Sequence, residues 1–135
     1  MTESSSNIIG FPIPNAPKAV GITEVINLSY DLYNLTISLT DSDKNSILVI
    51  FQSVIGFRVL DEGDLTEFWR SINSSHGWAF EITAGGWHDH EKLREGYFVS
   101  AHNSQAKEYV FLGCDDCVSV ISLEEPKFLS TLDNE

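Results

Sequence analysis

The sequence predicts an α+β domain: a mostly antiparallel, twisted β-sheet with one main helix packed on a face. Two observations support this prediction. Short runs in which apolar and polar residues alternate recur along the chain, and such alternation is typical of half-buried strands. Between two of these runs, four apolar residues follow helical spacing and make one apolar face: Leu65, Phe68, Trp69 and Ile72.

The length and the proline distribution predict the domain boundaries. A chain of 135 residues corresponds to about one domain. Three of its four prolines fall in residues 1–20, where they exclude a central strand or a helix interior. We therefore expect a flexible Pro/Ser-rich tail at residues 1–20 and a single domain at 21–125. The periodicity stops near Pro126, so residues 126–135 are predicted to be an acidic C-terminal tail.

We expect the first three strands in the N-terminal half of the chain. Alternation runs from Ile26 to Leu32 and again over residues 35–39. Residues 47–51 form a short β-branched and aromatic run, which suits a buried strand better than a helix. Because only a polar turn separates residues 35–39 from 47–51, the two runs predict an antiparallel hairpin.

The predicted helix follows directly. Gly56 marks a bend before a strand at residues 57–60. An acidic turn then leads into the helix, which we expect at residues 64–72. Asp64 is positioned to cap it, and Glu67 lies three residues later, where a capping-box partner belongs.

The second half of the chain is less regular. Residues 78–82 alternate as a strand, and Gly85-Gly86 allows a sharp bend. Residues 87–95 fit either a short helix or an exposed strand. Alternation resumes at Tyr97 and Val99. Residues 108–112 and 118–121 then predict a hairpin around an acidic turn.

The charge restricts the partners. The net charge is −12, from 20 acidic and 8 basic residues. Nucleic acid and anionic membranes would be repelled, whereas a basic protein would be attracted. No apolar run approaches the ~20 residues of a membrane span, and the N-terminus does not resemble a secretory signal. The two cysteines are too close together to staple the fold, so the cytoplasm is the expected compartment.

Catalytic and metal-binding patterns are sparse. His88, His90, Cys114 and Cys117 offer two imidazoles and a Cys-x-x-Cys spacing, the ligand types of a zinc site. The two histidines are only two positions apart, however, and two aspartates separate the thiols, so structural roles for these residues are favoured. The sequence contains no nucleophile elbow, phosphate loop or metalloprotease helix. We therefore expect neither an enzyme nor a cofactor.

Binding residues are the remaining candidates. Trp87 follows the Gly-Gly bend with Tyr97 and Phe98 nearby, and aromatic residues beside loops can anchor a partner. The alternative is that these aromatic residues pack in the core. Two acidic turns supply five further candidates: Asp61, Glu62, Asp64, Asp115 and Asp116.

Several stretches taken together resemble a group of small bacterial proteins similar to the immunity proteins of polymorphic toxin systems. They lie at residues 57–65, 68–69, 85–87, 108–109 and 117–120, with Ile50, Phe51 and Glu91. The resemblance covers roughly residues 48–122. It implies a stoichiometric inhibitor that binds a basic toxin through its acidic residues. The alternative is a small-molecule or metal-binding module that uses residues 87–91 with Cys114 and Cys117.

Overall fold

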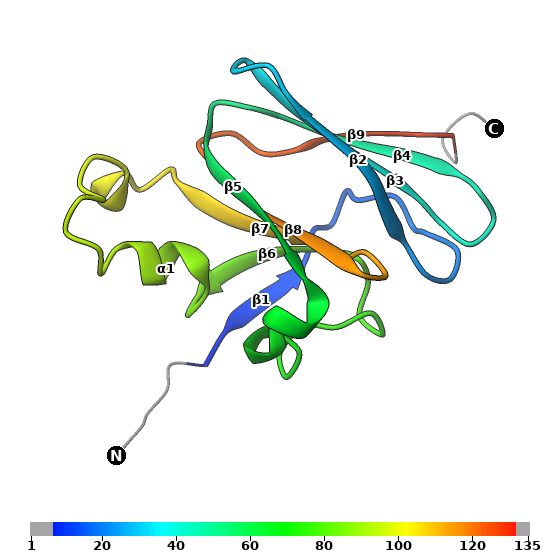
Figure 1. The fold of residues 1–135 in the computed structure, drawn as a ribbon, viewed down its shortest axis with the longest axis horizontal. Helices are drawn as coiled ribbons and strands as arrows, with labels where there is room; N and C mark the ends of the chain where they lie inside the picture. The colour runs from blue at the N-terminus through cyan, green and yellow to red at the C-terminus, as the bar shows by residue number, and fades with distance from the viewer. Residues whose placement is uncertain (1–6, 132–135) are drawn as a thin grey trace.

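The computed structural model describes residues 7–131, which form two antiparallel sheets (Figure 1). The five-stranded sheet has the order β1 (Ile9–Pro12), β6 (Ala79–Ala84), β7 (Lys107–Phe111), β8 (Asp116–Ser122) and β5 (Val54–Asp61). The four-stranded sheet has the order β2 (Glu24–Tyr30), β3 (Asn34–Thr40), β4 (Ser46–Gln52) and β9 (Lys127–Ser130). The prediction of mostly antiparallel strands is confirmed, including the hairpins β3–β4 and β7–β8.

The two sheets enclose the first hydrophobic core. Alternate residues of β3 and β4 are fully buried, because each strand turns one face toward the five-stranded sheet. Phe51 of β4 packs on Tyr109 and Phe111 of β7, with ring centroids 5.4 and 5.8 Å apart. The remaining strand residues of this core are Leu35, Ile37, Leu39, Ile47, Val49, Ala79, Val118 and Val120.

A second core covers the opposite face of the five-stranded sheet. Here β6, β7 and β8 contribute Phe80, Ile82, Val110 and Cys117, and the segment after β5 packs against them. Consequently β7 and β8 are buried on both faces, and most of their residues are inaccessible to solvent. The largely apolar stretches 109–111 and 117–121 within them are the pattern expected of a doubly covered strand.

The segment after β5 is not the predicted α-helix. It forms the 3-10 helices η1 (Glu62–Asp64) and η2 (Thr66–Phe68), in which the N–H of Phe68 bonds to the carbonyl of Leu65 at 2.9 Å. Its cap is Asp61, which accepts from Gly63 N at 2.8 Å, and not Asp64. So short a segment gains little from helix propagation, and packing dominates its conformation. Leu65, Phe68 and Ile72 are buried as expected, whereas Trp69 is only partly buried.

The ambiguous stretch contains the short helix α1 (Trp87–Glu91). The strand expected at Tyr97 and Val99 is wrong, because these residues lie in a loop before the 3-10 helix η3 (Ser100–His102). Val99 is largely exposed there and has no sheet partner among residues 7–131. No helix in this described range is long and apolar enough to cross a membrane.

Both predicted tails contain strands, so the boundaries at residues 21 and 125 are wrong. Strand β1 pairs with β6, and Ile8 and Ile13 beside it are buried. The prolines are compatible with this arrangement because β1 lies at the sheet edge and Pro12 ends it. Strand β9 pairs with β4 through residues 127–130. Residues 1–6 and 132–135 of the predicted tails lie outside the described part.

The two aromatic residues of the 3-10 segment provide a stability test. Phe68 is 1% exposed, so Phe68→Ala is expected to lower the free energy of unfolding by ~3–5 kcal/mol, as for other buried aromatic truncations. Trp69 lies at the edge of this core, where its indole N–H donates to the carbonyl of Glu62 at 3.0 Å. Trp69→Ala is expected to cost only about 1–2 kcal/mol. Urea unfolding measures the stability loss of each variant. Equal losses would contradict the placement of Phe68 inside the core and of Trp69 at its edge.

Candidate functional site

The two acidic turns meet at one end of the five-stranded sheet. The β5–β8 register places Asp61 opposite Asp116, and the N–H of Glu62 donates to the carbonyl of Asp115 at 2.8 Å. Asp64 follows within the same 3-10 turn. All five predicted acidic residues are exposed, and we call this group the acidic end: Asp61, Glu62, Asp64, Asp115 and Asp116. Tertiary structure therefore combines two turns that are about fifty residues apart in the sequence.

Within residues 7–131 no cation forms an ion pair with the acidic end. The ion pairs in that range, Lys92–Asp89 and Arg94–Glu91, both lie at α1 and the turn that follows it. Like charges directly opposite one another across a strand pair are destabilising. The Asp61–Asp116 pairing therefore costs stability, and a positively charged partner would relieve the repulsion.

An apolar hollow adjoins the acidic end. It has a volume of about 270 Å³, and we call it the Trp69 hollow. Trp69, Leu112 and Ile22 supply its apolar surface, while Glu62 lies at its border with the acidic end. Ile22 is 63% exposed, which is high for so large an apolar side chain. An apolar centre beside a charged border is the arrangement found in protein–protein interfaces.

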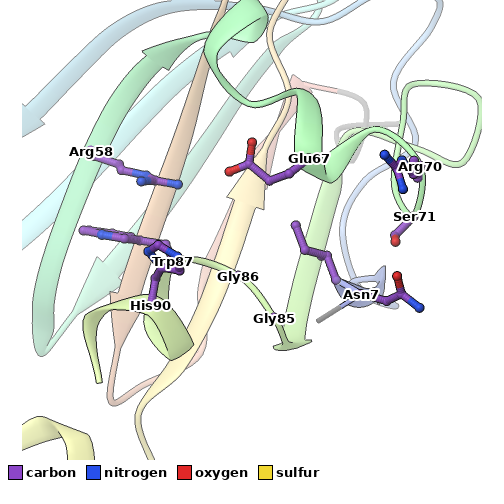
Figure 2. A pocket seen from close by; sticks show the side chains of 10 residues that line it. Asn7, Arg58, Glu67, Arg70, Ser71, Gly85, Gly86, Trp87 and His90 are labelled. Atoms are coloured by element: carbon purple, nitrogen blue, oxygen red, sulfur yellow. The ribbon is translucent and has the colours of Figure 1, made fainter. Parts of the chain in front are cut away.

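A second, polar groove lies where α1 approaches the segment after β5 (Figure 2). Its volume is about 410 Å³, and we call it the Arg58 groove. Figure 2 shows Arg58 and Trp87 stacked on one side and Arg70 on the other, with Glu67 between them. The guanidinium carbon of Arg58 lies 4.9 Å from the centroid of the Trp87 ring, a cation–π distance. Thus Trp87 is half-buried against Arg58 and is separate from the acidic end.

The position of α1 depends on a buried carboxylate in β7. Glu108 is 1% exposed and accepts hydrogen bonds from Trp87 N at 3.1 Å and His88 N at 2.8 Å. It thereby satisfies the free N–H groups of the helix start. Gly86 covers this carboxylate so closely that a Cβ there would lie 2.7 Å from Glu108 Oε1. The preceding Gly85 has φ of 78°, a conformation that favours glycine.

Burial perturbs two ionisable groups around α1. It raises the pKa of Glu108 above the usual glutamate value, although the two backbone donors and the charge of Arg58 oppose the change. Burial also lowers the pKa of His88, with the charge of Lys92 acting in the same direction. His88 is therefore held neutral, and its ring packs edge-on against Tyr97 at 5.7 Å.

The candidate metal ligands are not assembled. Cys114 is exposed, Cys117 is buried, and both are free thiols. His88 is a buried residue of α1, and His90 lines the Arg58 groove. Within residues 7–131, no group of three or more His, Cys, Asp or Glu side chains could hold a metal ion.

The sequence analysis did not identify Arg58, Arg70 and Glu108 as site residues. Glu108 carried a usable signal, because it precedes the apolar run 109–112 on a strand predicted to be buried. A carboxylate at such a position needs nearby donors. Arg58 and Arg70 gave no comparable signal, since their proximity to Trp87 arises only from the packing of β5 and the segment after it against α1.

Comparisons with known proteins assign neither a family nor a function to the chain. No protein-family model matches the chain, and neither does any curated protein or solved structure. The resemblance of residues 48–122 to toxin-immunity proteins therefore stays a prediction. Functional arguments rest on the geometry of the acidic end, the Trp69 hollow and the Arg58 groove.

The raised pKa of Glu108 predicts a pH-dependent effect of Glu108→Gln. In the unfolded chain this carboxyl ionises near its usual value of 4.5, so its contribution to stability is largest below that pH. The contribution is lost as the pH rises through the higher folded value. The variant cannot titrate and leaves one backbone N–H without an acceptor, which should cost about 1–3 kcal/mol at low pH.

Urea unfolding of the wild type and Glu108→Gln at about pH 4 and about pH 7 tests this expectation. The loss of stability should be larger at the lower pH. A larger loss at the higher pH would show instead that the two backbone donors outweigh burial and lower the pKa of Glu108.

Proposed function

We propose that this chain is a non-enzymatic, cytoplasmic protein-binding domain whose acidic end docks a basic protein. The observation that carries the proposal is the convergence of two acidic turns, including the opposed pair Asp61 and Asp116. Within residues 7–131 no cation pairs with these carboxylates. Their mutual repulsion lowers stability, and a basic partner would turn the same charges into favourable contacts.

The Trp69 hollow gives this surface an apolar centre. Binding energy in protein interfaces is concentrated in a few well-buried contacts, while charged borders steer the encounter and set specificity. The hollow of about 270 Å³ fits one large apolar side chain. The partner should therefore present a basic surface around one protruding apolar residue.

A toxin-immunity role is the most specific form of this proposal. It is supported by the resemblance of residues 48–122 to immunity proteins and by the net charge of −12. A nuclease toxin needs a basic surface to bind its substrate, so an acidic inhibitor complements it in charge. In this role the domain would act stoichiometrically by covering the toxin.

A charge reversal at the acidic end should slow association with such a partner. The partner is sought by pull-down with proteins encoded beside this chain. Glu62→Lys is expected to reduce the association rate by about tenfold at low salt, because steering depends on local charge. The effect should shrink as salt rises, since screening shortens the reach of the field to ~8 Å at physiological ionic strength.

Glu95→Lys is the matched control, because Glu95 is exposed, follows α1 and changes the net charge equally. It should leave the association rate nearly unchanged. Equal slowing by both variants would show that net charge, and not the acidic end, governs association. The proposal fails if no neighbouring protein binds, or if association is insensitive to both salt and Glu62→Lys.

A further inference from the structure

The Arg58 groove concentrates positive charge in an otherwise acidic protein. The chain has only three arginines, and two of them, Arg58 and Arg70, line this groove. The third, Arg94, is paired with Glu91 at 2.9 Å outside it. Figure 2 shows Arg58 and Arg70 on opposite sides of the groove.

The guanidinium groups in the groove lack hydrogen-bond acceptors. Neither Arg58 nor Arg70 has a carboxylate within 4.0 Å among residues 7–131. The Nε of Arg58 is inaccessible to solvent and has no hydrogen-bond partner. The guanidinium group lies over the Trp87 ring. An arginine has five donors in a planar fork, and leaving a buried donor unpaired is costly. A ligand acceptor in the groove would pair with guanidinium groups that no carboxylate of the described residues neutralises.

Nearby carboxylates balance part of the charge of Arg58, but none of them forms an ion pair with it. Glu108, Glu67 and Glu91 all act on Arg58 through space. Glu108 already accepts from two backbone N–H groups beneath Gly86. Glu67 lies beyond ion-pair distance of both arginines, which leaves room between the walls.

We propose that the Arg58 groove binds a monocarboxylate that also carries an N–H or O–H donor. The planar carboxylate matches the fork of Arg58 in a bidentate arrangement. Glu67 opposes a second negative charge, which disfavours phosphate, and it can accept from the donor of the ligand. A volume of about 410 Å³ holds a small organic molecule or the last residue of a polypeptide.

Two sources share this chemistry: a free amino acid and the C-terminal carboxylate of a polypeptide. The probes are L-serine for the first and N-acetylglycine for the second. Phosphate tests a different anion, and N-acetylglycinamide is matched to N-acetylglycine but lacks the carboxylate. Binding is followed by chemical shifts of the Arg58 Nε–H and Trp87 indole signals in isotope-labelled protein.

We expect saturable shifts of both signals with at least one carboxylate probe, at a Kd of about 1–10 mM for so small a ligand. The probe that binds more tightly identifies the source. Phosphate and the amide should give no saturable shift. The proposal is overturned if neither carboxylate shifts the Arg58 signal, if the amide binds as well as the acid, or if phosphate binds more tightly.

Substitutions in the groove test which side chains bind the carboxylate. Arg58→Lys keeps the charge but loses the fork and should weaken binding about tenfold. Arg70→Gln changes an exposed residue and should weaken binding several-fold, whereas Arg94→Gln, the matched control outside the groove, should have no effect. Unchanged binding in both Arg58→Lys and Arg70→Gln would refute the proposal even if the probes bind the protein.

Discussion

Burial of β7 and β8 on both faces is the constraint on which the remaining structure depends. One face of this strand pair requires the four-stranded sheet, whose β3 and β4 supply alternating apolar residues. The other face requires the 3-10 segment, with Phe68 and Ile72 at its centre. Because both faces must be covered, the short segment after β5 is held in position by packing, and this position creates one wall of each candidate site.

The segment at residues 62–74 therefore separates two different environments. Glu62 and Trp69 face the hollow beside the acidic end, whereas Glu67 and Arg70 face the groove beside α1. In 3-10 geometry side chains three residues apart point in the same direction, since the turn closes every three residues, and Glu67 and Arg70 accordingly share the groove side. A protein partner at the acidic end and a small carboxylate in the groove would thus contact opposite sides of one element.

Glu108 shows how a polar group within the doubly buried strand can be accommodated. Its two oxygens accept the N–H groups at the start of α1, so the helix is anchored directly over the sheet. Gly85-Gly86 permits this close approach, and a larger residue at position 86 would collide with the carboxylate. The stacked pair Arg58 and Trp87 follows from that anchoring, because Trp87 begins the helix that Glu108 holds.

The sequence by itself determined the pattern of the central strands, although it missed β1 and β9 at the ends of the chain. Alternation at residues 35–39 and the continuous apolar runs at 47–51 and 109–112 specify which residues face a core, and the polar turns between runs specify antiparallel pairing. The same local signals failed at residues 64–72 and at Tyr97 and Val99. Spacing identified the buried face of the first segment, but it did not distinguish an α-helix from 3-10 turns.

Only the tertiary structure decided how the sites are assembled. The sequence identified the five acidic residues and Trp87 as separate candidates, and the β5–β8 register brought Asp61 opposite Asp116. Arg58, Arg70 and Glu108 acquired their roles from contacts between elements far apart in the chain. Periodicity reports which face of an element is buried, whereas a binding site depends on which elements meet, and that is set by the packing of the whole core.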